Sequence, residues 1–214
     1  MARGTVVIDP GHGGTENMDG SDANHAVSPS GVLEKNMTLQ MGLLVRDALL
    51  AANRNGHAIK VFMTRTTDTN LRLSARANVA RDQRADLLLS IHFNGFDGIV
   101  RGVETLVRPV ADGNVNHDED KAFAEKIHRR VFEAVRARDP KTKDRGVKDQ
   151  KLGVLNDAAL GNTAASHPCR ACLLEIEFID VADVDALLNT GPNAAAARGD
   201  IARAIAAAIV EELT

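Results

Sequence analysis

The sequence predicts an α/β fold, an open, twisted and mostly parallel sheet with helices on both faces. Three observations predict it. Short apolar runs alternate with segments of helical periodicity, turn residues follow each apolar run, and no internal repeat or sharp change of composition interrupts this order. A chain of 214 residues suits one domain of ordinary size, so we expect residues 1–214 to form a single domain.

Five apolar runs are predicted to be strands. Each is short, each is rich in leucine or β-branched residues, and turn residues follow each of them. They cover residues 5–9, 59–64, 86–92, 102–107 and 171–179.

Four further segments are predicted to be helices. Apolar residues recur at helical spacing from Met37 to Leu49, after Asn36, which we expect to be the N-cap. The same spacing occurs between Phe123 and Val135. The other two helices are expected over residues 73–84 and 193–213. Three irregular stretches remain, and loops of this length usually line a site; they are residues 11–33, 108–118 and 138–167.

Composition excludes several classes of function. The 26 Lys and Arg residues stand against 29 Asp and Glu, so no basic excess is available to neutralise a nucleic-acid backbone. Tyr and Trp are absent and Phe numbers six, which leaves few aromatic rings for stacking on bases. No run of 18 apolar residues occurs, so we expect no membrane span. The N-terminus passes directly into the first strand, so we expect no signal peptide in this chain and the route of export stays open.

The two cysteines form one Cys-x-x-Cys pair. In an extended segment the Cα atoms of Cys169 and Cys172 would lie about 10 Å apart, beyond the roughly 7 Å that a disulfide allows. The spacing therefore favours buried thiols over a structural or redox pair.

Two histidines end predicted strands. His12 stands in the turn Asp9-Pro10-Gly11-His12-Gly13-Gly14, and His92 closes the strand of residues 86–92. Ligands bind at the carboxyl ends of strands in open α/β sheets, so both imidazoles can face one crevice. A dinucleotide fingerprint would run from Gly-x-Gly-x-x-Gly straight into a helix, whereas a polar loop follows here, which disfavours nucleotide binding.

A pair of strand-end imidazoles suggests Zn²⁺, which takes three protein ligands and a water in catalytic sites. Glu34, just ahead of the first helix, is the candidate third ligand. The alternative is that Glu34 only complements the positive end of the helix. His25 and His167 lie in loops and are kept as reserve ligands.

Two acids interrupt the apolar strand of residues 171–179. Alternation along a strand predicts that Glu175 and Glu177 point to the same face. A buried carboxylate is costly unless it is paired, hydrogen-bonded or near a metal, so one of them is a candidate general base. A hydrogen-bonded structural acid and an exposed edge position are the alternatives. Neither His-Glu-x-x-His nor Gly-x-Ser-x-Gly occurs, which excludes a helix-based zincin and the usual serine elbow.

These residues resemble a known family, the zinc-dependent N-acetylmuramoyl-L-alanine amidases of the cell-wall amidase type. The resemblance implies a phosphorylase/hydrolase-like fold with the active site at the carboxyl ends of the strands. Seven motifs follow the family's order over nearly the whole chain; they are residues 7–14, 34–36, 64–78, 90–94, 102–105, 145–148 and 174–179.

The resemblance assigns roles to four residues. His12, Glu34 and His92 fall on the zinc ligands, one Zn²⁺ per chain, and Glu175 falls on the catalytic glutamate. Glu177 stands where the family usually has glycine, so we expect this second acid to perturb the pKa of Glu175. The loop between His12 and Glu34 is longer than the family pattern, which could reshape the groove.

The implied reaction is hydrolysis of the amide between N-acetylmuramic acid and the L-Ala of the stem peptide in peptidoglycan, at the bacterial cell wall, periplasmic or extracellular. Alternatives are a zinc amidohydrolase acting on another peptidyl or acyl amide, and a catalytically silent peptidoglycan-binding domain. Some regulated members plug the zinc site with an extra helix after the strand of residues 102–107. The segment 108–118 is too short and polar for that, so we expect no obligatory protein activator.

Overall fold

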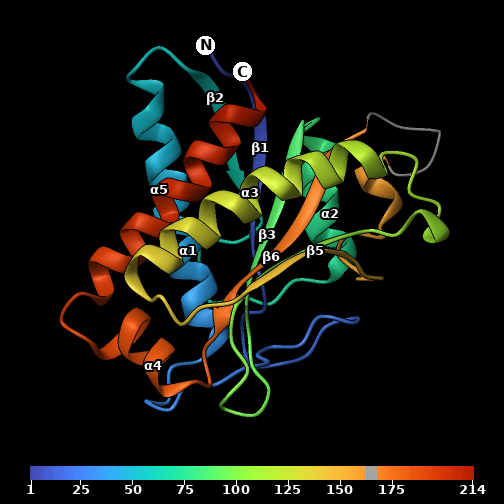
Figure 1. The fold of residues 1–214 in the computed structure, drawn as a ribbon. Helices are drawn as coiled ribbons and strands as arrows, with labels where there is room; N and C mark the ends of the chain where they lie inside the picture. The colour runs from blue at the N-terminus through green and yellow to red at the C-terminus, as the bar shows by residue number, and fades with distance from the viewer. Residues whose placement is uncertain (162–167) are drawn as a thin grey trace.

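The computed structural model describes residues 1–161 and 168–214, and its strands form one six-stranded sheet (Figure 1). The strand order is β2-β1-β3-β6-β4-β5. β4 runs antiparallel to β6 and every other neighbouring pair is parallel, which confirms the predicted mostly parallel sheet. The strands are β1 (Arg3–Pro10), β2 (Ala58–Met63), β3 (Leu87–Asn94), β4 (Val103–Val107), β5 (Asp144–Asp149) and β6 (Arg170–Phe178).

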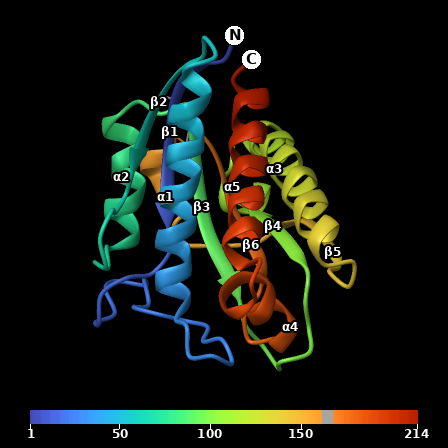
Figure 2. The ribbon, with the colours of Figure 1, turned by 90° about the vertical axis from the view of Figure 1, so that its left-hand side faces the viewer.

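Helices cover both faces of this sheet, as predicted. Three of them, α1 (Glu34–Asn53), α3 (His117–Arg138) and α5 (Ala194–Glu212), pack together on one face. α2 (Leu73–Asp82) covers the other face, and Figure 2 shows it on the opposite side from α3 and α5. No helix in the described ranges is both long enough and apolar enough to cross a membrane.

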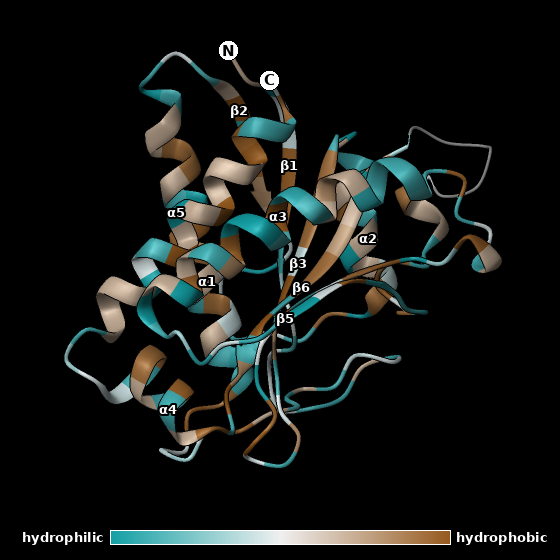
Figure 3. Cartoon of the chain, viewed as in Figure 1, coloured by the Kyte–Doolittle hydropathy of each residue, from teal (hydrophilic) through white to brown (hydrophobic). Residues whose placement is uncertain are grey.

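The central strands are buried on both faces, which explains their near-continuous apolar sequences. Side chains alternate along β1, so that Val6 and Ile8 join the core beneath α1 while Val7 joins the core beneath α2. Figure 3 shows hydrophobic residues along these central strands. The two cores hold β1, β3 and β6 side by side. Because these strands are parallel, their carboxyl ends lie at the same edge of the sheet.

The thiols of Cys169 and Cys172 are free and buried, as the spacing favoured. Burial raises the pKa of both thiols well above the usual value, so neither is a reactive thiolate at neutral pH.

Three local features differ from the sequence predictions. Asn36 is not the N-cap, because the helix begins at Glu34 after Leu33. β5 falls in a stretch predicted to be irregular, since its sequence Asp-Arg-Gly-Val-Lys-Asp lacks the apolar pattern of a buried strand and it pairs only with β4 at the sheet edge. Residues beyond β6 form α4 (Ala182–Asp185) and a π-helical turn (Ala186–Thr190), which no pattern indicated.

Candidate metal centre

The turn after β1 presents His12 in an unusual backbone conformation. His12 has φ 61°, in the left-handed region, and Gly13 has φ 133°. A Cβ on Gly13 would lie 2.3 Å from the carbonyl oxygen of Thr69, and one on Gly11 would lie 2.2 Å from the His92 ring. The glycines therefore permit the close approach around His12 that the sequence predicted.

Glu34 occupies the first position of α1 and is 1% exposed. The loop before it folds back over the sheet edge, so that Glu34 Oε2 accepts a hydrogen bond of 3.0 Å from the Ala26 backbone N–H. Its Oε1 accepts one of 3.1 Å from the Phe93 N–H, next to His92. These contacts direct the carboxylate toward the sheet edge. A carboxylate that only complemented the positive end of the helix would face solvent instead.

The donor atoms of His12, Glu34 and His92 converge. Glu34 Oε1 lies 3.1 Å from both His12 Nε2 and His92 Nδ1, and the ligand atoms of the three residues lie within 4.8 Å of one another. Ligands bound at about 2.0–2.2 Å to a tetrahedral Zn²⁺ are themselves about 3.3 Å apart, so the observed spacing suits that ion. Two imidazoles and one carboxylate are also a donor set of catalytic zinc sites.

A backbone contact orients the His12 ring. Its Nδ1 lies 2.9 Å from the carbonyl oxygen of Asp22, which can only accept, so Nδ1 carries the hydrogen. This tautomer leaves a lone pair on Nε2, the atom that faces Glu34. The ring is thus prepared to bind a cation through Nε2.

Electrostatics keep Glu34 and His92 in ligating forms in the metal-free protein. Burial alone would raise the pKa of Glu34, but its interactions with His12 and His92 outweigh burial and lower that pKa far below its usual range. Desolvation lowers the pKa of His92 and overcomes the opposing effect of Glu34. The pKa of His12 is raised, because its contacts with Glu34 outweigh desolvation. Glu34 is therefore a carboxylate and His92 a neutral imidazole at pH 7.

Two buried arginines hold the turn in place. Arg76 of α2 donates to the carbonyl oxygens of Pro10 and His12, each at 2.8 Å, and forms a 2.9 Å ion pair with Asp9. Arg65, just after β2, donates to the carbonyl oxygens of Pro10, Gly11 and Lys35. Both residues lie in the motifs of the family resemblance, but sequence reasoning gave them no role. The available signal was that both arginines fall within one motif of the resemblance, residues 64–78.

Asp9 completes this support. It is buried and accepts hydrogen bonds from Thr64 Oγ1 at 2.6 Å, Ser90 Oγ at 2.7 Å and Arg76. Desolvation would raise the pKa of Asp9, but the Arg76 charge and these hydrogen bonds lower it. Asp9 therefore ties β1 to the residue that follows β2, to β3 and to α2 beneath the candidate metal ligands.

Glu175 lies on β6 in register with His92 of β3 and with Glu104 of β4. Residues directly opposite on neighbouring strands share a face, so Glu175 stands between these two side chains. Its Oε2 is buried and has no hydrogen-bond partner among the described residues. Desolvation, with Glu34 and Glu104 as like charges, raises the pKa of Glu175 well above its usual value. An unsatisfied buried carboxyl oxygen beside a metal site is typical of a general base.

Glu177 has a different environment. Its carboxylate accepts hydrogen bonds from the Gly102 N–H at 2.7 Å, from Thr142 Oγ1 at 2.5 Å and from the Phe178 N–H at 3.0 Å. The β3–β6 register shifts between His92 and Asn94, but Leu174, Ile176 and Phe178 all join the core beneath α1, so side chains still alternate along β6. The expectation that Glu177 perturbs Glu175 is wrong, because the acids that act on it are Glu34 and Glu104.

A cavity of about 150 Å³ opens beside the donor set, and its lining includes His12, His92, Arg76 and Leu173. A larger hollow of about 630 Å³ lies between α1 and α5, is mainly apolar and contains none of these residues. Of the reserve ligands, His25 is exposed and stacks on the His12 ring at 6.5 Å between centroids, outside the cluster. His167 lies outside the described residues.

The segment 108–118 contains a single 3₁₀ turn (Val110–Asp112), and α3 then begins at His117.

Comparison with known proteins places the chain in a family. A family model described as N-acetylmuramoyl-L-alanine amidase matches residues 6–210. The N-acetylmuramoyl-L-alanine amidase CwlM of Bacillus licheniformis is 32% identical over 155 residues, which are 72% of this chain and 52% of that protein. The sporulation-specific N-acetylmuramoyl-L-alanine amidase of Bacillus subtilis is 31% identical over 195 residues, 91% of this chain and 64% of that protein.

A solved structure agrees. The catalytic domain of CwlV, an N-acetylmuramoyl-L-alanine amidase from Paenibacillus polymyxa, superposes with a TM-score of 0.74 at 28% identity, covering 97% of each chain. The present chain spans about half to two thirds of the length of the two curated relatives. It belongs to the family of N-acetylmuramoyl-L-alanine amidases, which are hydrolases.

Proposed function

We propose that residues 1–214 form a single catalytic domain that hydrolyses the amide between N-acetylmuramic acid and L-Ala in the peptidoglycan stem peptide. One observation carries the proposal: two imidazoles and a carboxylate converge within 4.8 Å, beside a carboxyl oxygen without a partner, in a chain of this family. The cofactor would be one Zn²⁺ held by His12, Glu34 and His92. The place of action would be the cell wall, periplasmic or extracellular, as the names of the relatives suggest.

Zn²⁺ bound at these three residues would supply Lewis acidity for the scissile carbonyl and lower the pKa of an attacking water. Glu175 would take the proton of that water and pass it to the nitrogen of L-Ala as the amide breaks. The raised pKa of Glu175 in the metal-free protein suits this role, since a nearby cation favours its carboxylate form before the proton arrives.

Arg65 and Arg76 would act as positioning residues. Both donate to backbone carbonyls of the His12 turn, so they hold the His12 backbone in its left-handed conformation. This is the arrangement that keeps a site close to its reactive geometry before substrate binds.

We further propose that the domain works without a protein activator. Before α3 begins at His117, the segment 108–118 forms a three-residue 3₁₀ turn, which is too short to cover the donor set as a plugging helix would.

The test is product analysis after digestion of purified peptidoglycan. The proposal predicts released peptides with a free L-Ala amine, chelator-sensitive release, recovery on adding Zn²⁺ and about one zinc per chain. Zinc without release would favour another amide substrate, and binding to peptidoglycan without metal or turnover would favour a silent binding domain.

A further inference from the structure

A cationic pair lies at the sheet edge beyond the candidate base. Arg145 and Lys148 of β5 both donate to Glu104 of β4, Arg145 through Nε at 2.8 Å, and both reach the same oxygen, Oε2. Glu104 is 9% exposed, whereas Arg145 is 31% and Lys148 45% exposed. Within the described ranges Glu104 is the only acid paired with either cation, so the group carries one net positive charge facing solvent.

These side chains share a face of the sheet with Glu175. Glu104 lies directly opposite Glu175, and Leu106, two residues further along β4, lies opposite both Leu173 of β6 and Lys148 of β5. Since opposite residues and those two apart point to the same side, Glu175, Glu104 and Lys148 form a row across β6, β4 and β5.

The cations retain donors that Glu104 does not use. A guanidinium has five N–H groups and an ammonium three, and Glu104 engages only Nε of Arg145 and one N–H of Lys148. The Arg145 guanidinium also lies 5.0 Å from the Phe178 ring centroid, a cation–π contact that holds it in one orientation. The pair is thus a partly ordered anion-binding surface with free donors.

The proposed reaction indicates which part of the substrate would meet this surface. Glu175 would protonate the leaving nitrogen of L-Ala, so the peptide side of the substrate would begin at β6. The proposed metal ligands, in the turn after β1, on β3 and on α1, would lie on the acyl side. Two strand spacings, roughly 10 Å, separate β6 from β5. Two extended residues span about 7 Å, and the cations reach back from β5 to Glu104, so the residue after L-Ala comes within their reach.

We propose that Arg145 and Lys148 bind the carboxylate of the stem-peptide residue that follows L-Ala. This inference rests on the proposed function and adds a specificity: the domain prefers stems whose second residue carries a free carboxylate over stems in which that group is a carboxamide. A carboxylate gains charge-assisted hydrogen bonds from the pair, and the neutral amide does not.

The test compares two synthetic muramoyl peptides that differ only at this group, D-isoglutamate in one and D-isoglutamine in the other. We expect the unmodified protein, loaded with zinc, to show a kcat/KM about fivefold higher for the carboxylate substrate. This ratio corresponds to the free energy of a partly exposed ion pair, and most of it should appear as a lower KM. Raising the salt concentration to about 1 M should reduce this ratio, because the pair faces solvent.

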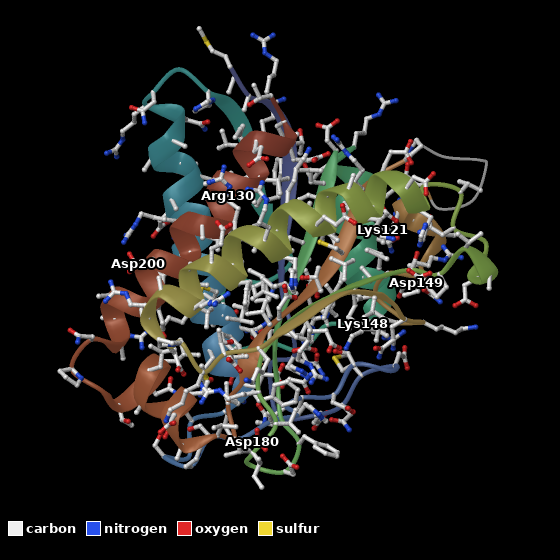
Figure 4. All side chains as sticks on the ribbon, viewed as in Figure 1. Lys121, Arg130, Lys148, Asp149, Asp180 and Asp200 are labelled. Atoms are coloured by element: carbon white, nitrogen blue, oxygen red, sulfur yellow. The ribbon has the colours of Figure 1, made fainter. Side chains whose placement is uncertain are left out.

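Three variants sharpen the test. Lys148→Met should bring the ratio close to one, while Lys148→Arg should keep it, since the charge remains. Lys121→Met is the matched control, because Lys121 is an exposed lysine on another element, α3, and is not among the cations that pair with Glu104 (Figure 4). Its ratio should equal that of the unmodified protein. Melting temperatures check that each variant is folded.

A ratio near one in the unmodified protein, or a full preference retained by Lys148→Met, overturns the inference while turnover itself leaves the proposed function standing. Failure of the zinc-loaded protein to hydrolyse either substrate overturns the proposed function and this inference with it. The salt series needs no variant, so the inference stays testable if a substitution impairs folding.

Discussion

The two halves of the site differ in how their polar groups are satisfied. Beside His12, the carboxylates of Glu34 and Asp9 are buried, and each accepts several hydrogen bonds. On β6 and β4, Glu175 leaves an oxygen without a partner in the described part of the chain, and the cations beyond it are open to solvent. The contrast indicates that the first half holds a fixed geometry, and under the proposed function the second half would change protonation and meet substrate.

The largest effect is expected in the first half, which contains the proposed zinc ligands. His92→Ala removes one of three ligands, so we expect loss of stoichiometric zinc and a fall in activity of at least about 10⁴-fold, since the Lewis acid goes with the ligand. Zinc content by elemental analysis and peptide release check it. Full zinc occupancy in this variant would show that the cluster is not the metal site.

Glu175→Gln separates the two halves. The amide cannot accept the proton of the water, so kcat should fall by about 10²- to 10⁴-fold while zinc stays bound. The measurement is peptide release alongside metal content. Glu177→Gln is the comparison, since its carboxylate is hydrogen-bonded to Gly102 and Thr142, and its effect should appear in stability. Normal turnover by Glu175→Gln with zinc bound would contradict its role as the base.

Replacing a carboxylate by an amide should lower the free energy of unfolding at Asp9, in the first half, and raise it at Glu175, in the second. Asp9→Asn leaves the buried Arg76 charge unpaired, so the metal-free protein should lose about 3–5 kcal/mol of unfolding free energy at pH 7. Glu175→Gln removes a carboxylate that burial disfavours and should gain about 1 kcal/mol. Denaturant unfolding of the metal-free variants measures both, and equal signs would break the comparison.

The pH dependence of these effects follows from the pKa shifts. The folded pKa of Asp9 is depressed, so its stabilisation is present above the unfolded value near 3.8 and is lost as pH falls through the folded pKa. The folded pKa of Glu175 is raised, so its contribution is complete below about 4.5 and is lost as pH rises. The deficit of Asp9→Asn should therefore shrink in acid, and the gain of Glu175→Gln should vanish there.

The smallest effect is expected from Gly11→Ala. The new Cβ would meet the His92 ring at 2.2 Å, so the imidazole must move, at a cost of about 1–3 kcal/mol. We expect weaker zinc affinity with the fold retained, measured by competition with a chelator. Gly31→Ala offers a control for a strained glycine, because nothing lies within 4 Å of its Cβ position although its φ is 84°. Equal zinc affinities in the two variants would show that Gly11 has no such role.

Sequence patterns identify the strands that are buried on both faces along their whole length. β1 and β3 are apolar on both faces, so their pattern alone identifies them. β5 is polar and depends on pairing with β4, which no local pattern reports. The helix begins at Glu34 and not after Asn36, because the Glu34 carboxylate is fixed by Ala26 and Phe93, contacts distant in sequence.

The site divides in the same way. His12 and His92 follow from strand ends in a parallel sheet, and the family resemblance assigns Glu34 and Glu175. The difference between Glu175 and Glu177 depends on Gly102 and Thr142, which are distant in sequence and donate only to Glu177. Likewise, the roles of Arg65 and Arg76 depend on backbone carbonyls that meet only in the folded chain.

X-ray diffraction from crystals of the zinc-loaded protein, recorded on both sides of the zinc absorption edge, tests the central claim most directly. The account predicts one anomalous peak per chain, about 2.0–2.2 Å from His12 Nε2, a Glu34 carboxylate oxygen and a ring nitrogen of His92. Glu175 should lie beside the ion without ligating it. A peak elsewhere, or one that lacks any of these three ligands, would contradict the account.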